Sequence, residues 1–246
     1  MAFDLSSITK GRGKKPPRII IYGEHGLGKS TFAAGAPSPV FIQTEDGLEA
    51  IDTSKFPLCK TYDDVIGWIT TLYKEEHEYK TVVLDSVDWL EQIIEKKVTS
   101  EYSEQDRGYG KDQVLVSQFM RKALDGLNAL RSERGMAVIV TAHCRVRRFD
   151  DPAGDSYDRF ELKLGKRTNA LVQEWADVIG FAAHKVHVVT TEEGFNKKIK
   201  RGKDMGRVLN LQRTPAFDAK DRYGMPAEID LSWDAFSSAF ANASAK

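Results

Sequence analysis

The stretch that decides the fold is RIIIYGEHGLGKSTF, residues 18–32. It begins with an apolar β-branched run, passes through GEHGLGKS at Gly23–Ser30, and leads into a segment with helical spacing. The octapeptide matches the pattern G-x-x-x-x-G-K-[S/T], in which a glycine-rich loop joins a buried strand to a helix. The sequence therefore predicts a phosphate-binding loop between a strand and a helix.

The chemistry of this loop follows from its residue types. Glycines let the main chain curl, so that successive N–H groups and the helix N-terminus face phosphate oxygens. We expect Lys29 to reach the β- and γ-phosphates of ATP, the Ser30 hydroxyl to bind Mg²⁺, and Thr31 to contact the α-phosphate. The predicted nucleotide-binding residues are Gly23, Glu24, His25, Gly26, Leu27, Gly28, Lys29, Ser30 and Thr31.

Strand and helix patterns alternate on both sides of the loop. Short β-branched runs predict buried strands at 19–22, 40–44, 81–84, 137–141 and 178–181, and helical spacing marks 31–36, 63–76, 87–99 and 112–134. This alternation predicts an α/β fold with a mostly parallel sheet covered by helices on both faces. After residue 181, VHVVTT, the turn at 192–194 and FNKKIK predict a C-terminal β-hairpin appendage, followed by a strand near 208–212.

Composition limits the class of protein. The chain has 246 residues, of which 41% are hydrophobic and 29% charged, as expected for one folded core domain. Its 36 basic and 36 acidic residues give no whole-molecule attraction to nucleic acid or to a membrane. We expect a basic N-terminal arm at 1–17, a core at 18–225 and a C-terminal tail or helix at 226–246. With no secretory signal and no membrane-length apolar run, the predicted location is the cytoplasm, with no membrane partner.

A carboxylate at the end of a second strand is expected to complete the magnesium site. TVVLDS places Asp85 at the end of such a strand, and the predicted metal-binding residues are therefore Ser30 and Asp85. Asp88 is the competing carboxylate, but its position on the following helix predicts a role in stabilising the first helical turn.

Two further strand ends and a long helix, together with the loop and Asp85, resemble the corresponding segments of a known family. VFIQTEDGLEA ends a strand near Glu45, MAVIVTAH ends another at His143, and LVSQFMRKALDGL forms the helix. Together these segments resemble the RecA-like recombinase core of AAA and RecA-like P-loop ATPases, over Arg18 to Arg222. The resemblance implies ATP and Mg²⁺ as ligands and a RecA-like core as the fold.

The resemblance also implies catalytic roles for the two strand ends. Glu45 would orient the attacking water, and a carboxylate at that place suits a general base. His143 would sense the γ-phosphate, where many members carry glutamine. A solvated glutamate and an ordinary strand-end histidine are the alternatives. The predicted catalytic residues are Lys29, Glu45, Asp85 and His143.

Two segments resemble the DNA-binding loops of the family, at 102–112 and 144–167. The predicted nucleic-acid contacts are Arg107, Lys111, Arg145, Arg147, Arg148, Lys163, Lys166 and Arg167. The second segment holds seven basic and five acidic residues, so seven minus five leaves only two net positive charges. The prediction depends instead on arrangement, since Phe149, Tyr157 and Phe160 lie between basic clusters as surfaces for base stacking. A solvated surface loop is the alternative.

In size the chain resembles phage-encoded RecA-like ATPases of the single-strand annealing type. The resemblance implies a homo-oligomer, either filament or ring, whose site is completed by a neighbour's basic residue, with Arg213 and Arg222 as candidates. The chain departs from the family in lacking an aromatic residue soon after Glu45 to hold adenine, and in lacking a separate polymerisation domain. Phe3 or Phe236 would either insert into a neighbour or anchor this chain's own core.

The sequence therefore favours a DNA-stimulated ATPase that binds single-stranded DNA and promotes annealing or strand pairing in phage homologous recombination. Its partners would be single-stranded DNA and a single-strand DNA-binding protein, in the host-cell cytoplasm. A small P-loop kinase, a nucleotide-regulated DNA-binding module with little turnover, and a helicase or helicase loader are the alternatives.

Overall fold

The computed structural model describes residues 4, 8, 10, 11, 15–152, 154–192 and 198–245, with the main chain alone at 186–192 and 198–205. Most of the basic arm expected at 1–17, including Phe3, lies outside the described residues. So does the predicted hairpin turn at 193–194.

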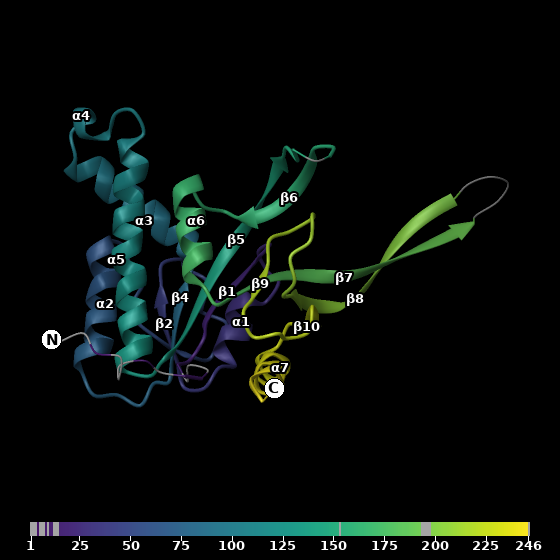
Figure 1. The fold of residues 1–246 in the computed structure, drawn as a ribbon, viewed down its shortest axis with the longest axis horizontal. Coiled ribbons are helices and arrows are strands. Elements are labelled where there is room, and N and C mark those ends of the chain that lie inside the picture. Colours follow the sequence, from purple (N-terminus) through teal and green to yellow (C-terminus); the bar gives the residue numbers. More distant parts are fainter. Residues whose placement is uncertain are drawn as a thin grey trace.

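A mostly parallel sheet forms the centre of the molecule (Figure 1), in the order β10-β8-β7-β1-β5-β4-β2-β3. Its strands are β1 (Arg18–Gly23), β2 (Pro39–Gln43), β3 (Ser54–Lys55), β4 (Thr81–Asp85), β5 (Ala137–Phe149), β7 (Val178–Glu192), β8 (Lys198–Asn210) and β10 (Glu228–Asp230), while β6 (Tyr157–Leu162) pairs with β5 and β9 (Lys220–Asp221) with β7. All neighbours from β7 to β3 are parallel, whereas β8 and β10 are antiparallel additions. The predicted α/β arrangement is confirmed.

Strand β1 lies between β5 and β7 and is buried on both faces. Ile20 and Tyr22 belong to one hydrophobic cluster and Ile19 and Ile21 to the other, because side chains alternate along a strand. None of the four is exposed to solvent. A strand without a polar face requires a layer of helices on each side of the sheet.

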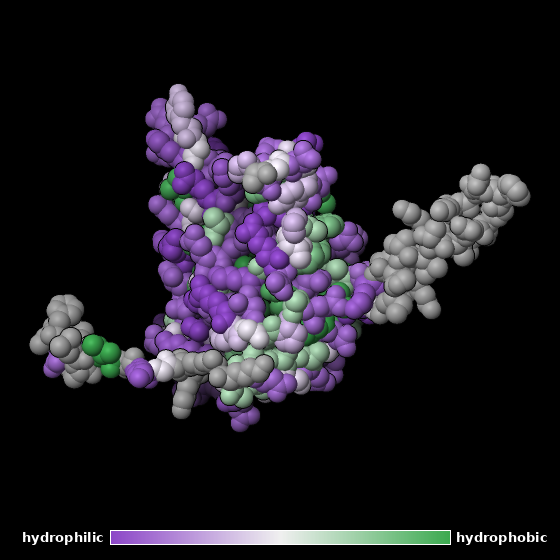
Figure 2. All heavy atoms as spheres, turned by 45° about the vertical axis from the view of Figure 1, so that its right-hand side comes forward, coloured by the Kyte–Doolittle hydropathy of each residue, from purple (hydrophilic) through white to green (hydrophobic). Residues whose placement is uncertain are grey.

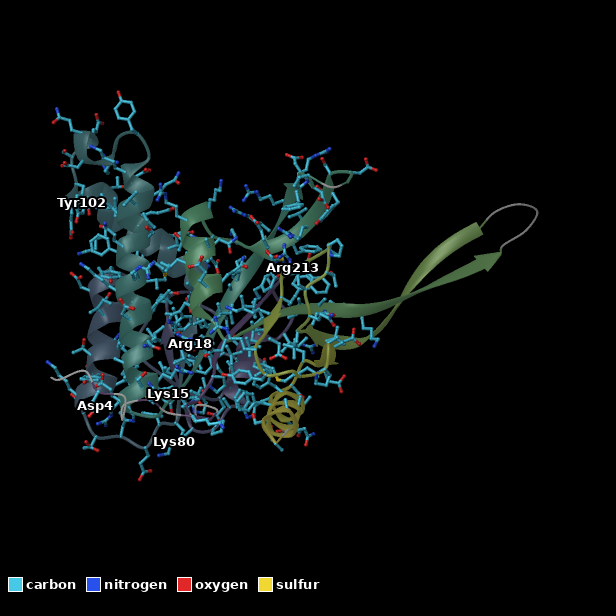
Figure 3. The ribbon with its side chains drawn as sticks, viewed as in Figure 1. Asp4, Lys15, Arg18, Lys80, Tyr102 and Arg213 are labelled. Carbon is cyan, nitrogen blue, oxygen red and sulfur yellow. The ribbon has the colours of Figure 1, made fainter. Side chains whose placement is uncertain are left out.

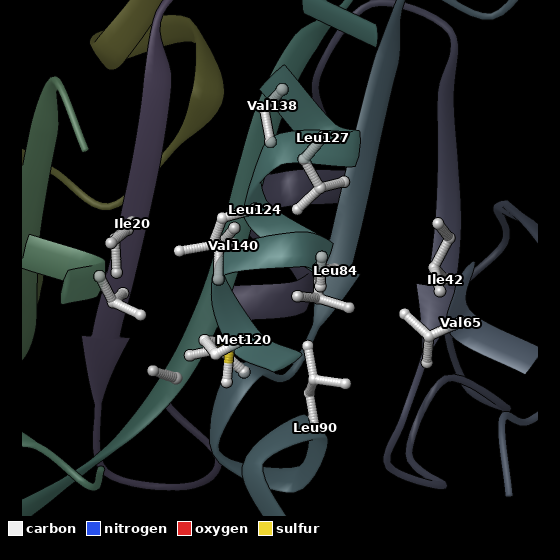
Figure 4. Close-up of a cluster of buried hydrophobic side chains, with 14 of the residues drawn as sticks. Ile20, Ile42, Val65, Leu84, Leu90, Met120, Leu124, Leu127, Val138 and Val140 are labelled. Carbon is white, nitrogen blue, oxygen red and sulfur yellow. The ribbon is translucent and has the colours of Figure 1, made fainter. Parts of the chain in front are cut away.

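The two layers of helices are unequal. One face carries α2 (Tyr62–Lys74), α3 (Val87–Glu101), α5 (Lys111–Glu133) and α6 (Lys166–Trp175); the other carries α1 (Lys29–Ala34) and α7 (Trp233–Ser244); and the short α4 (Glu104–Arg107) precedes α5. Figure 4 shows Met120, Leu124 and Leu127 of α5 lying over the sheet residues Leu84 and Val140. The helices predicted at 31–36, 63–76, 87–99 and 112–134 are confirmed, with ends shifted by at most two residues.

The last helix packs against the helix that follows the phosphate-binding loop. Phe32 of α1 makes edge-to-face contacts with Trp233 and Phe236 of α7, at ring-centroid distances of 5.7 and 5.8 Å. Phe236 is 1% exposed. It therefore anchors α7 in the core of its own chain, which is one of the two roles expected for it.

The segment expected as the second DNA loop is a β-hairpin for most of its length. β5 runs parallel to β1 as far as His143, and from Cys144 to Phe149 it pairs antiparallel with β6. The segment is therefore not an irregular loop, because the antiparallel register lets the inward-facing main-chain groups of the two arms bond to each other. Its contact with DNA stays a prediction. Figure 1 shows this hairpin and α4 projecting from the same end of the molecule, whereas the longer β7/β8 hairpin extends to one side.

The aromatic residues of this hairpin do not all face solvent. Phe160 stacks on Phe181 at 5.1 Å, and Phe181 stacks on Phe217 at 4.8 Å. Phe149 and Tyr157 pair with each other at 5.3 Å. Phe160 is therefore part of the hairpin's base, and the expectation that it offers a free stacking surface is wrong.

The surface seen in Figure 2 is mainly hydrophilic, with apolar residues in small areas. Among the exposed large apolar side chains are Tyr109, fully exposed in the turn between α4 and α5, and Val146, 59% exposed in the β5/β6 hairpin. Among the residues that the structure describes, no helix has the length and apolar character that a membrane crossing needs.

Candidate active site

The loop from Gly23 to Lys29 is shaped by its glycines. Gly26 and Gly28 have φ values of 73° and 94°, in the left-handed region that favours glycine. At Gly23 a Cβ atom would lie 2.5 Å from the Ala182 carbonyl oxygen of the neighbouring strand, so only glycine fits there. The side chain of Leu27, 3% exposed, points into the core. The loop is thereby fixed between β1, β7 and α1.

Lys29 lies within this loop and is 7% exposed. Its Nζ donates hydrogen bonds to the carbonyl oxygens of Gly23, at 3.2 Å, and Glu24, at 2.7 Å. Burial lowers the pKa of Lys29, while the negative charges of Asp85 and Asp88 oppose that shift. The loop therefore holds an amino group at the point where phosphate charge is expected.

Ser30 and Asp85 meet at the carboxyl edge of the sheet. The Ser30 hydroxyl donates to Asp85 Oδ2 at 2.7 Å, and the Thr141 hydroxyl donates to Asp85 Oδ1. Asp85 is 8% exposed at the end of β4. A hydroxyl and a carboxylate are oxygen donors of the kind that Mg²⁺ prefers, so these two residues fit the predicted metal site.

Asp88 has a more specific role than the one expected from its place in the helix. It does lie in the first turn of α3, but its side chain is 1% exposed and both oxygens bind His143. Asp88 Oδ1 accepts from the His143 main-chain N–H at 3.0 Å, and Oδ2 lies 2.9 Å from Nδ1. Although burial opposes it, these hydrogen bonds lower the pKa of Asp88. The predicted place of Asp88 in the first helical turn is confirmed, and the structure adds the contact with His143, because β5 brings that histidine over the turn.

The hydrogen bond that His143 donates to Asp88 also determines the state of the histidine ring. It raises the pKa of His143, against the effect of burial. Since Asp88 is an ionised acceptor, Nδ1 carries a proton. His143 is therefore a ring with Nδ1 fixed to a buried carboxylate and with its charged form favoured.

Glu45 follows β2 and comes close to the same histidine. Its Oε2 lies 3.9 Å from His143 Nδ1 and accepts a hydrogen bond from the Ser86 hydroxyl at 3.4 Å. The preceding Thr44 is tied to Ser86 by two hydrogen bonds, 2.7 Å to the carbonyl oxygen and 2.9 Å from the N–H. The side chain of Glu45 is 31% exposed, so it is accessible to water.

One cavity of about 320 Å³ gathers these groups. It is lined by His25, Gly26, Gly28, Lys29, Ser30, Thr31, Glu45, Gly47, Ile51, Asp85, Ser86, His143 and Arg207. All four predicted catalytic residues are among them. Sequence reasoning missed the parts played by Ser86, Asp88 and Arg207. A signal for Ser86 and Asp88 was present, because both stand beside the predicted Asp85 in the segment TVVLDSVD. No signal near Arg207 indicated that β8 would reach the phosphate-binding loop.

A protein-family model described as an AAA domain matches residues 15–223. The chain belongs to the AAA-domain family. The AAA domain is a P-loop NTPase domain that binds nucleotide, and the family consists generally of ATPases. The match includes the loop at Gly23–Ser30 and the strand ends at Glu45, Asp85 and His143. A search of curated proteins finds no match.

The predicted nucleic-acid residues fall into two groups. In the β5/β6 hairpin, Arg145 and Arg147 pair with Glu161 at 2.7 and 3.6 Å, and Arg148 lies 3.8 Å from Asp150. These ion pairs offset much of the positive charge expected there. Lys111, at the start of α5, and Lys163, directly after β6, are exposed.

The second group lines a groove of about 400 Å³ between α3, α5 and α6. It contains Arg107, Lys166 and Arg167 together with acidic residues, among them Glu91. The buried Glu91 accepts hydrogen bonds from the Gly165 N–H, at 2.9 and 3.1 Å. The structure therefore brings together three predicted contacts that come from both DNA-loop segments.

Neither residue expected to act in a neighbouring subunit lines the cavity of its own chain. Arg222 lies 3.1 Å from Asp177, which also binds Arg18 at 2.7 Å, at the amino ends of β1 and β7. Arg213, beside the base of the β5/β6 hairpin in Figure 3, lies 3.4 Å from Asp218. Action in a neighbour stays a prediction for both. The arginine that does line the cavity, Arg207, belongs to the same chain.

Proposed function

We propose that this chain is a RecA-like ATPase, stimulated by single-stranded DNA, that promotes annealing or strand pairing in phage homologous recombination. The observation that carries the ATPase part is the hydrogen bond between Ser30 and Asp85, in one cavity with Lys29, Glu45 and His143. The AAA-domain family supports nucleotide hydrolysis. The role in recombination is a proposal that goes beyond this ATPase activity.

Phosphate binding follows from the loop's donors. Lys29 contributes its buried ammonium to the β- and γ-phosphates, and main-chain N–H groups of the loop surround the phosphate oxygens. Ser30 and Asp85 would hold Mg²⁺, which supplies positive charge at the β- and γ-phosphate oxygens. Removing water from this cavity would strengthen each of these electrostatic contacts.

Glu45 is the proposed base that orients water. Its carboxylate is partly exposed, faces the cavity and is held by the Ser86 hydroxyl, so a water between Glu45 and the γ-phosphate could give up its proton to Oε1 or Oε2. A positioned general base contributes about 10²–10⁴ in rate.

His143 is the proposed γ-phosphate contact, with Asp88 as its positioning residue. Because Nδ1–H donates to Asp88, Nε2 donates to a phosphate oxygen only when the ring is an imidazolium. Asp88 favours that form by raising the pKa of His143. Loss of the γ-phosphate on hydrolysis would remove the partner of Nε2, so His143 distinguishes ATP from ADP.

Coupling to DNA is supported by the course of β5. The same strand carries His143 in the cavity and, two residues on, Arg145 at the start of the hairpin. The exposed Tyr109, on the connection between α4 and α5, and the groove with Arg107 and Arg167 add a stacking surface and cations near that end. We propose that single-stranded DNA lies across the β5/β6 hairpin, the groove and the α4 turn.

Oligomer formation belongs to the same proposal. A filament or ring would align these basic surfaces along one strand of DNA, and a single-strand DNA-binding protein would hand over the substrate in the host-cell cytoplasm. Arg213 or Arg222 would then act on a neighbour's nucleotide. Sedimentation with and without ATP and single-stranded DNA tests this part; a monomer under every condition would contradict it.

The deciding experiment measures ATP hydrolysis without DNA, with single-stranded DNA and with duplex, using Lys29→Ala as the blank. We expect strong stimulation by single strands. Hydrolysis that ignores DNA would contradict DNA-coupled catalysis and leave a metabolite kinase, which a phosphorylated product would reveal, or a module that uses nucleotide for assembly. Strand separation on a forked duplex would instead indicate a helicase.

A further inference from the structure

A second hollow, of about 470 Å³, adjoins the phosphate cavity. It is lined by Leu27, Gly28, Thr31, Phe32, Gly35, Arg207, Asp230, Leu231, Ser232, Trp233 and Asp234. Gly28, Thr31 and Arg207 line both spaces. The two hollows therefore meet at the end of the loop, where Arg207 lies.

Arg207 is held against the main chain of the loop. Its Nη1 donates to the Leu27 carbonyl oxygen at 3.0 Å, and a Cβ atom placed on Gly28 would lie 2.8 Å from Nη1. Any side chain at Gly28 would therefore displace the guanidinium. Glycine at this position allows both the left-handed turn and the close approach of the arginine.

The strand that carries Arg207 also shapes the second hollow. The Arg207 carbonyl oxygen accepts from the Leu231 N–H at 3.0 Å, and Val208 pairs with Asp230 in the β8–β10 ladder. These bonds fix the turn before α7 beside the loop. The second hollow is thus bounded by regular elements on both sides: α1, and the β8–β10–α7 unit.

The arrangement of residues along the phosphate cavity indicates which part of a nucleotide would enter the second hollow. Asp85, Glu45 and His143 mark the end where the γ-phosphate reacts, and they line only the first cavity. Loop N–H groups hold the α- and β-phosphates. The rest of the nucleotide must then leave past Thr31, on the side of the second hollow.

We infer that the second hollow binds the nucleoside half of a nucleoside di- or triphosphate, and that Arg207 contacts the α- and β-phosphate oxygens from the same chain. This inference rests on the proposed nucleotide hydrolysis and deepens it. A guanidinium matches phosphate geometry with paired N–H donors. Trp233 gives the hollow an aromatic wall, and the exposed carboxylates of Asp230 and Asp234 accept hydrogen bonds from ribose hydroxyls or a base amino group.

The role of Arg207 is tested by calorimetric titration of Arg207→Ala with ADP and with inorganic tripolyphosphate. Both ligands should bind roughly tenfold to a hundredfold more weakly than to the wild type, because a hydrogen-bonded charge contact is lost. Arg121→Ala, an exposed arginine on α5, is the matched control and should bind like the wild type. Unchanged thermal unfolding without ligand would show that the loop itself is intact, and Arg207→Lys should recover part of the affinity.

The place of the nucleoside is tested by filling the second hollow with Asp230→Trp. ADP should then bind at least about tenfold more weakly, since the added ring occupies the space, while tripolyphosphate should bind as in the wild type. Glu228→Trp, on the same strand but outside the hollow, is the control.

The outcomes separate the inference from the function on which it rests. A wild-type protein that binds neither ATP nor ADP would overturn the proposed function itself. Nucleotide binding that is unchanged by Arg207→Ala would overturn the contact with Arg207. ADP binding that is unchanged by Asp230→Trp would overturn the nucleoside subsite.

Discussion

The phosphate cavity and the predicted DNA-binding surface, made of the β5/β6 hairpin and the groove with Arg107 and Arg167, use charge differently. In the cavity, charged groups converge on a shared space: Lys29, Asp85, Glu45 and His143 all line it. In the β5/β6 hairpin, charges of opposite sign pair with each other, as Arg145 and Arg147 do with Glu161. Convergence leaves charge for a ligand, whereas pairing uses much of it within the protein.

This difference teaches where mutations should act strongly. A buried or half-buried group aimed into a cavity has few substitutes, and its electrostatic effect is screened little by salt. An exposed arginine with a carboxylate partner contributes little net charge, and its effect on a polyanion is shared with its neighbours. Mutations in the cavity should therefore have large and specific effects, and those on the predicted DNA-binding surface small and additive ones.

The largest effect is expected from Lys29→Ala, which removes the ammonium in the loop. We expect kcat/KM for ATP hydrolysis to fall by at least about a thousandfold, because the charge that meets the phosphates is lost. Steady-state hydrolysis measures it, with the exposed Lys74→Ala as the control. Retained ATP hydrolysis in Lys29→Ala would show that the charged groups lining the cavity do not carry out catalysis.

Glu45→Gln should come next, with a fall in kcat of about a hundredfold or more and little change in ATP affinity. The amide keeps the size of the side chain but does not accept a proton from water. Single-turnover hydrolysis and a separate binding titration divide the two effects. An unchanged hydrolysis rate would make the proposed role of Glu45 wrong even if the nucleotide site is right.

Asp88→Asn tests the charged histidine through its pH dependence. The pKa of His143 is raised above its ordinary value by Asp88, so the imidazolium and the activity it supports should be lost as pH rises through that raised value. Without the carboxylate, the decline should move to lower pH, with about tenfold less activity above neutrality. Asp63→Asn, an exposed site, is the control. Identical pH profiles would contradict the role given to Asp88.

The smallest effects are expected on the predicted DNA-binding surface. Arg167→Ala should weaken binding of a labelled single-stranded oligonucleotide a few-fold and reduce the slope of log K against log salt by about 0.7. Arg145→Ala should do less, since Glu161 already offsets that charge. Anisotropy titrations at several salt concentrations compare the two. A larger loss for Arg145 would contradict the expectation that its ion pair with Glu161 reduces its effect on DNA.

The fold was predictable because its signals are local. The run at Arg18–Gly23 is buried throughout β1 except for a partly exposed Arg18, and the spacing of Met120, Leu124 and Leu127 gives the buried stripe of α5. The meeting of Ser30 and Asp85 was predictable too, since Asp85 ends β4 and Ser30 follows the loop after β1, and the carboxyl ends of these strands share one edge of a parallel sheet.

What escaped prediction depends on contacts between distant segments. Asp88 looked like a helix-start residue until β5 placed His143 above it, 55 positions away in sequence. The hairpin arms after Cys144 carry closely spaced charges without the strict alternation that would indicate strands, and their pairing with each other is seen only in the structure. Arg207 reaches the loop because β8 follows β7 back into the sheet, a connection that charge pattern does not indicate.

The packing of Phe32 on α7 shows that the family match and the packed core of this protein end at different residues. The family match ends at residue 223, ten positions before α7 begins at Trp233. The family match therefore leaves out a helix that packs against the matched part. A fragment trimmed to the match would lose the rings of Trp233 and Phe236 from the back of Phe32. The family match covers the shared domain, but α7, which lies outside the match, packs against α1 and supports the helix that follows the phosphate-binding loop.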